Sequence, residues 1–97
     1  MMNNNAVVVM ANDISILVVD DQLLVRTGIS RMLDEMDDFK VIGEAETGEE
    51  ALQLIARRQP DVVLMDVRMP GMGGIEATRK IARQYPDVRI VVLTACG

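Results

Sequence analysis

Three aspartates stand where two apolar stretches of the chain come to an end. Asp20 and Asp21 follow the run ILVV, and Asp66 closes the run VVLMD. Carboxylates that crowd together repel one another strongly in a partly dry cleft, so a cation among them would stabilise the arrangement. Oxygen ligands without histidine or cysteine favour Mg²⁺, Mn²⁺ or Ca²⁺. The three residues are therefore candidate metal ligands if the fold brings them together.

Four short runs rich in β-branched residues predict strands, and stretches with helical spacing of apolar residues lie between them. Thr47 with Glu50 three residues later is a capping box that predicts the start of the second helix. Strands that alternate with helices imply a doubly wound α/β fold, with a parallel sheet covered by helices on both faces. The predicted strands are Ile14–Val19, Phe39–Gly43, Val62–Met65 and Val88–Leu93.

The carboxyl ends of the strands are where open α/β sheets bind their ligands. The three aspartates are predicted at such ends, Thr94 closes the last strand, and the second strand ends near Glu44. A single aspartate after a strand is more often a turn residue or a helix cap. Three of them at ends that meet on one rim favour a shared site. Thr94 alone is weak evidence, because threonine is common in strands.

Composition narrows the class of protein further. The chain has 97 residues, no histidine, one cysteine and a formal net charge of −5. This length fits one small domain, and the acidic balance argues against a nucleic-acid surface. No apolar run approaches the ~20 residues of a membrane span. We expect a cytoplasmic protein with a flexible tail over residues 1–13 and one domain over residues 14–97.

Four longer sequence motifs resemble those of a known protein family. The stretches LVVDDQLLVRTGI, EAETGEEAL, PDVVLMDVRMPGMGGIEATRKI and VRIVVLTA together resemble the receiver domain of two-component response regulators. Within that family the likeness is to the NarL/FixJ class and its GacA/UvrY type, and it runs without a gap from about Ile14 to Thr94. The resemblance implies a flavodoxin-like receiver fold with strand order 2-1-3-4.

The resemblance also implies residue roles and partners. Asp66 would accept a phosphoryl group from a sensor histidine kinase, a phosphotransfer domain or a small phosphodonor. Asp21, Asp66 and the backbone carbonyl of Arg68 would bind Mg²⁺ directly, and Asp20 would bind it through water. Thr94 would be the switch hydroxyl that turns toward the phosphorylated aspartate. Full-length relatives of this class regulate transcription, whereas the 97 residues given include no element for direct DNA contact.

The sequence departs from the family pattern after Thr94. A receiver has five strands, and the fifth carries a lysine near the phosphoryl group. The given sequence, which ends in TACG, contains no counterpart of that strand. The fourth strand is then expected to be an edge, with residues 90–93 open to pairing with a second copy. We therefore expect self-association through this strand and slow phosphorylation of Asp66. The four-stranded domain is also expected to be marginally stable.

The sequence is compatible with two functions. The first is a signalling receiver rather than an enzyme, phosphorylated on Asp66 with Mg²⁺. The second is a truncated, non-phosphorylated fragment that docks on a kinase through Leu23–Met36 or pairs with other receivers. A metal-dependent phosphatase is disfavoured, because such enzymes usually place a second acid two residues after the nucleophile, where this chain has Arg68.

Overall fold

A computed structural model of the chain describes residues 13–69 and 72–93. Strands and helices alternate in the predicted order, and each predicted strand is found with its bounds shifted by two residues at most. The tail predicted over residues 1–13 lies outside the described part except for Asp13, and Thr94 also lies outside it. The elements are β1 (Ile14–Val19), α1 (Leu23–Asp34), β2 (Phe39–Ala45), α2 (Gly48–Arg57), β3 (Val62–Asp66), α3 (Gly74–Gln84) and β4 (Arg89–Leu93).

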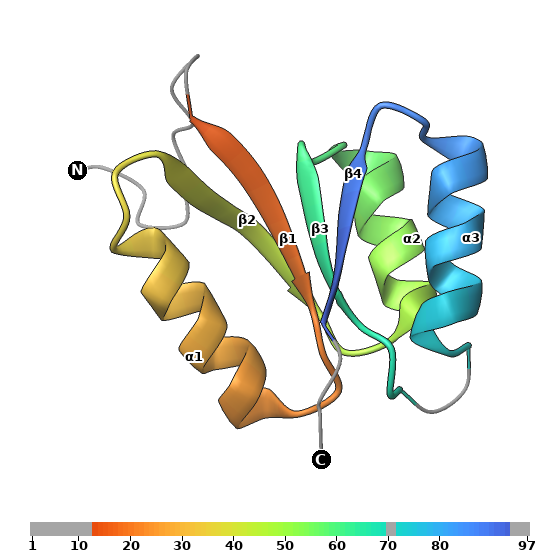
Figure 1. Cartoon of the computed structure of the whole chain (residues 1–97), viewed down its shortest axis with the longest axis horizontal. Helices are drawn as coiled ribbons and strands as arrows, with labels where there is room; N and C mark the ends of the chain where they lie inside the picture. The colour runs from red at the N-terminus through yellow and green to blue at the C-terminus, as the bar shows by residue number, and fades with distance from the viewer. Residues whose placement is uncertain (1–12, 70–71, 94–97) are drawn as a thin grey trace.

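The four strands form one sheet in the order β2-β1-β3-β4, and every neighbouring pair is parallel. Helix α1 lies on one face of the sheet, and α2 and α3 lie together on the other (Figure 1). This confirms the predicted doubly wound α/β class and the strand order 2-1-3-4. Because β1 and β3 are adjacent and parallel, their carboxyl ends lie side by side at one edge of the sheet.

The core sits mainly between the sheet and the α2–α3 layer. Strand β1 runs through the middle of the sheet, and its residues 16–19 are each at most 3% exposed. A continuous apolar run is what a strand covered on both faces requires. The buried apolar cluster comprises Leu17, Val19, Ala45, Ala51, Ile55, Val63, Met65, Met69, Ala77, Ile81 and Val88.

Local signals in the sequence account for two helix starts. The Thr47 hydroxyl accepts a hydrogen bond from the Glu50 backbone N–H at 3.0 Å, so α2 begins where the capping box predicts. Helix α3 begins at Gly74, where a β-carbon would overlap the carbonyl oxygen of Asp66 and lie 2.5 Å from Cα of Val67. Only glycine fits this position, because the first turn of α3 lies directly against the end of β3.

Several apolar side chains of α1 are exposed. Within the described residues Leu24 is 88% exposed, Met32 is 55% exposed, and the one buried residue of α1 is Ser30. On β4, Val91 and Val92 are also exposed, and this strand is an edge of the sheet as far as the described residues extend. None of the helices in the described part is both long and apolar enough to cross a membrane.

Candidate metal centre

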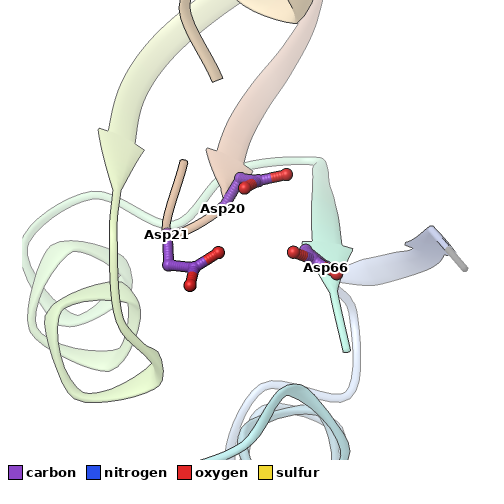
Figure 2. Close-up of side chains that lie close together, drawn as sticks. All are labelled: Asp20, Asp21 and Asp66. Carbon is purple, nitrogen blue, oxygen red and sulfur yellow. The ribbon is translucent and has the colours of Figure 1, made fainter. Parts of the chain in front are cut away.

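The three aspartates meet at one rim of the sheet. Asp20 directly follows β1 and is 5% exposed, Asp21 is exposed beside it, and Asp66 is the half-buried last residue of β3. One carboxylate oxygen from each residue lies within 4.8 Å of those of the other two. Figure 2 shows the three side chains directed toward a common space. The convergence predicted from the strand ends is therefore present in the structure.

Backbone donors hold two of these carboxylates in place. The Gln22 N–H donates to Oδ1 of Asp20 at 2.8 Å, and the Arg68 N–H donates to Oδ1 of Asp66 at 3.0 Å. Each bond closes a turn between an aspartate and the residue two positions later, a motif typical of aspartate after a strand. The turns restrict the rotation of both side chains, and each leaves the second carboxylate oxygen outside the turn.

The electrostatics of the rim are unfavourable without a cation. Burial is the main reason that the pKa of Asp20 is raised above its ordinary value of 3.8, and the charges of Asp66 and Asp21 raise this pKa further. The hydrogen bond from the Gln22 N–H and the charge of Arg26 act in the opposite direction. A divalent cation among the three carboxylates would favour their charged forms. An all-oxygen donor set of carboxylates fits a hard divalent cation such as Mg²⁺.

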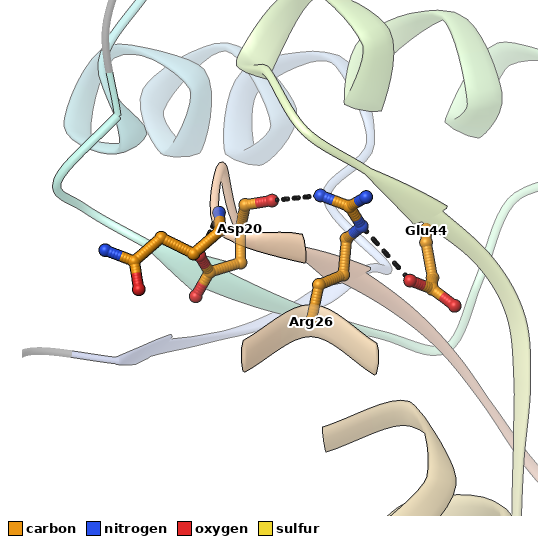
Figure 3. A network of polar contacts seen from close by, with 4 residues as sticks. Asp20, Arg26 and Glu44 are labelled. Carbon is orange, nitrogen blue, oxygen red and sulfur yellow. Dashed lines mark hydrogen bonds and ion pairs between the residues drawn. The ribbon is translucent and has the colours of Figure 1, made fainter. Parts of the chain in front are cut away.

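A fourth participant was missed by the sequence reasoning. Arg26, on the first turns of α1, donates from one terminal nitrogen to the backbone carbonyl of Asp20 at 2.8 Å. Its Nε lies 3.1 Å from Oε1 of Glu44 and forms an ion pair with it. Glu44 was expected near the end of the second strand without a function, whereas β2 continues through Ala45. Figure 3 shows Arg26 linking the end of β1 to β2.

Arg68 and Thr94 are the two remaining residues with predicted roles at the site. Arg68 is exposed in the loop after β3, and its backbone N–H contacts Asp66. Metal binding by its carbonyl oxygen stays a prediction. Thr94 lies outside the described residues, so its role as a switch hydroxyl also stays a prediction.

Comparisons with known proteins agree on the kind of domain. The family model for the response regulator receiver domain matches residues 16–97. The response regulator GacA of Pseudomonas viridiflava is 57% identical over 83 residues, which are 86% of this chain and 39% of that protein. The response regulator UvrY of Escherichia coli K12 is 54% identical over 81 residues, 84% of this chain and 37% of that protein.

A solved structure supports the same assignment. The receiver domain of the response regulator NarL from Mycobacterium tuberculosis is 38% identical to this chain with a TM-score of 0.77, covering 84% of this chain and 65% of that one.

The fold and the similarity to known proteins together define a signalling domain. The chain belongs to the response regulator receiver domain family of two-component systems, and its curated relatives are of the GacA and UvrY type. This confirms the family predicted from the sequence motifs. Domains of this family are signalling proteins. The chain spans about two-fifths of the length of the curated relatives it matches.

Proposed function

We propose that the chain receives a phosphoryl group on Asp66 and does so with Mg²⁺ held by the acid cluster. The observation that carries this proposal is that one oxygen from each of three carboxylates, at the ends of two adjacent strands, lies within 4.8 Å of the others. Asp66 is half buried at the open rim, and its Oδ1 is oriented by the Arg68 N–H. A carboxylate held in this way is a suitable nucleophile for covalent catalysis.

In the proposed reaction a carboxylate oxygen of Asp66 attacks the phosphorus of the donor. An O–P bond forms on Asp66 while the donor's P–N or P–O bond breaks, and the leaving group keeps the bonding electron pair. When bound, Mg²⁺ would neutralise negative charge on the phosphoryl oxygens. Asp21, Asp66 and the Arg68 carbonyl would bind the ion directly, and Asp20 would bind it through water. Thr94 completes the proposal as the switch hydroxyl.

The proposed partners follow from the receiver family. The donor is a sensor histidine kinase or a phosphotransfer domain in the cytoplasm, and it docks on α1. The exposed apolar side chains of Leu24 and Met32 on this helix support an interface there. The proposal also places a domain over residues 14–97 after an N-terminal tail, and it assigns transcription control to the full-length relatives.

Self-association through β4 is a separate part of the proposal. Among the described residues β4 is an edge of the sheet, with Val91 47% exposed and Val92 42% exposed, and its backbone groups can pair with a second copy. Sedimentation velocity over a range of concentrations would test this, and a single monomeric species throughout would contradict it.

Intact-mass spectrometry tests the phosphorylation directly. The chain would be incubated with Mg²⁺ and a small acyl phosphate, alongside Asp66→Asn and Asp37→Asn. Asp37 is an exposed aspartate in the loop between α1 and β2, so its variant controls for nonspecific modification. We expect one added phosphoryl group in the unaltered chain and in Asp37→Asn, none in Asp66→Asn, and none after chelation of Mg²⁺.

The alternative function gives a different result in the same experiment. A folded chain, verified by circular dichroism, that gains no phosphoryl group would refute phosphorylation of Asp66. It would favour the interaction fragment that docks on a kinase or pairs with other receivers without being modified. Phosphorylation that survives in Asp66→Asn would place the acceptor on another residue.

A further inference from the structure

Arg26 connects three elements around the candidate metal centre. Its guanidinium extends from α1, donates to the carbonyl oxygen of Asp20 at 2.8 Å and pairs with Glu44 of β2 at 3.1 Å. The Arg26 side chain is 12% exposed, so its charge is largely removed from water, whereas that of Glu44 is 38% exposed. A charge this buried usually needs a partner, and Glu44 is the one that the structure supplies.

The backbone carbonyl that Arg26 contacts lies between the two adjacent acids of the site. It belongs to the peptide group that joins Asp20 to Asp21, so a donor on this oxygen restricts the orientation of that peptide plane (Figure 3). The direction in which each of the two acids leaves the backbone depends on the same plane. The planar guanidinium can serve both acceptors at once, because its N–H groups point in fixed directions.

We propose that Arg26 is a positioning residue for the metal site, which acts on the acid pair through the Asp20 carbonyl and is itself held by Glu44. Arg26 does not contact the cation in this proposal. The inference rests on the proposed Mg²⁺ site and adds a residue to it. Groups that orient metal ligands without touching the metal commonly change its affinity by about 10- to 100-fold when they are removed.

Whether removal of Arg26 weakens or strengthens Mg²⁺ binding distinguishes a positioning role from a purely electrostatic one. A positive charge near the acids opposes a cation, so removing Arg26 would strengthen Mg²⁺ binding if charge were its only contribution. Loss of the constraint on the Asp20–Asp21 peptide would instead weaken binding. The ion pair with Glu44 offsets much of the charge of Arg26, so we expect the positioning effect to be larger.

Isothermal titration calorimetry with MgCl₂ measures the Mg²⁺ affinity of each variant and so shows the direction of the change. We expect Arg26→Met to bind Mg²⁺ about tenfold more weakly than the unaltered chain. Arg26→Lys should recover part of the loss, because an ammonium group can reach one of the two acceptors but lacks the fork for both. The matched control is Arg31→Met, which makes the same change at an exposed position of α1 and should leave the affinity unchanged.

Urea unfolding of the same samples separates positioning from loss of fold. Glu44→Gln keeps Arg26 in place but leaves its charge less well compensated, so it should weaken Mg²⁺ binding by less than Arg26→Met does. If Arg26→Met does not fold, weaker binding by a folded Arg26→Lys carries the test. Equal or tighter binding by the folded Arg26 variants would overturn the inference. An unaltered chain that binds no Mg²⁺ would overturn both the metal site and this inference.

Discussion

The contact between Gly74 and the end of β3 gives the sharpest prediction for stability. A β-carbon at this position would lie 2.5 Å from Cα of Val67 and 3.0 Å from the carbonyl carbon of Asp66, and it would overlap the carbonyl oxygen. All of these neighbours are backbone atoms, so no side-chain rotation relieves the contact. In Gly74→Ala either α3 or the loop that carries Asp66 must move.

The size of the effect follows from the nature of the contact. Overpacking against a rigid surface typically costs about 1–3 kcal/mol. Alanine regains about 1 kcal/mol of helix propensity over glycine, and this gain is smaller at a helix end. We therefore expect Gly74→Ala to lower the free energy of unfolding by about 2 kcal/mol. For a domain of this size that corresponds to a fall in Tm of about 10 °C.

Gly28 provides a matched control for this prediction. It lies inside α1, and a β-carbon there would meet no heavy atom within 4 Å. Gly28→Ala should therefore raise the free energy of unfolding by up to about 1 kcal/mol through helix propensity alone. Urea unfolding of both variants, followed by circular dichroism, gives the two signs in one assay. A Gly74→Ala protein as stable as the unaltered chain would refute the close contact at the end of β3.

Two further predictions concern single carboxylates. The raised pKa of Asp20 means that the folded state binds its proton more tightly than the unfolded state, so its contribution destabilises the metal-free protein increasingly as pH rises from 3.8 through the raised value. Asp20→Asn should remove this dependence in urea titrations and stabilise the metal-free protein at neutral pH, while weakening Mg²⁺ binding; an unchanged pH profile would contradict the argument. At the opposite end of β1, Asp61 Oδ2 accepts hydrogen bonds from the backbone N–H and hydroxyl of Ser15. Asp61→Ala should cost about 2 kcal/mol in urea unfolding without changing the Mg²⁺ affinity of the folded chain, and an unchanged urea midpoint would show that the pair is not stabilising.

The parts of the fold that depend on local chemistry were predictable. Residues 16–19 of β1 form a continuous apolar run because both faces of the strand are covered there, and Thr47 caps α2 through a bond to Glu50, three positions along the chain. The meeting of Asp20 with Asp66 followed from a rule about parallel sheets, because adjacent strands bring their carboxyl ends to the same rim. These inferences needed residue order and periodicity, and the sequence contains both.

Contacts that depend on the placement of a helix were not predictable in the same way. Arg26 and Glu44 are 18 residues apart, and their ion pair depends on how α1 lies across β2. One signal was present: a helical side chain is tilted toward the N-terminus of its helix, so a long residue in the first turns of α1 can reach back to the loop before it. The helical spacing of apolar residues predicted α1 as a helix but did not indicate what covers them, and Leu24 and Met32 are exposed within the described residues.

The contacts that hold the acid cluster fix its geometry without neutralising its charge. Fixed cations that fully neutralised the three carboxylates would leave little electrostatic attraction for a metal ion. In the described residues, the groups that hold the cluster are instead backbone N–H donors on one oxygen of Asp20 and of Asp66, and an arginine on the carbonyl behind the acid pair. These contacts set the geometry and do not neutralise the cluster. Burial is the main reason that the pKa of Asp20 is raised, and the charges of Asp66 and Asp21 raise it further. A cation that binds among the carboxylates then changes the electrostatic energy of the rim by more than it would in a neutralised site.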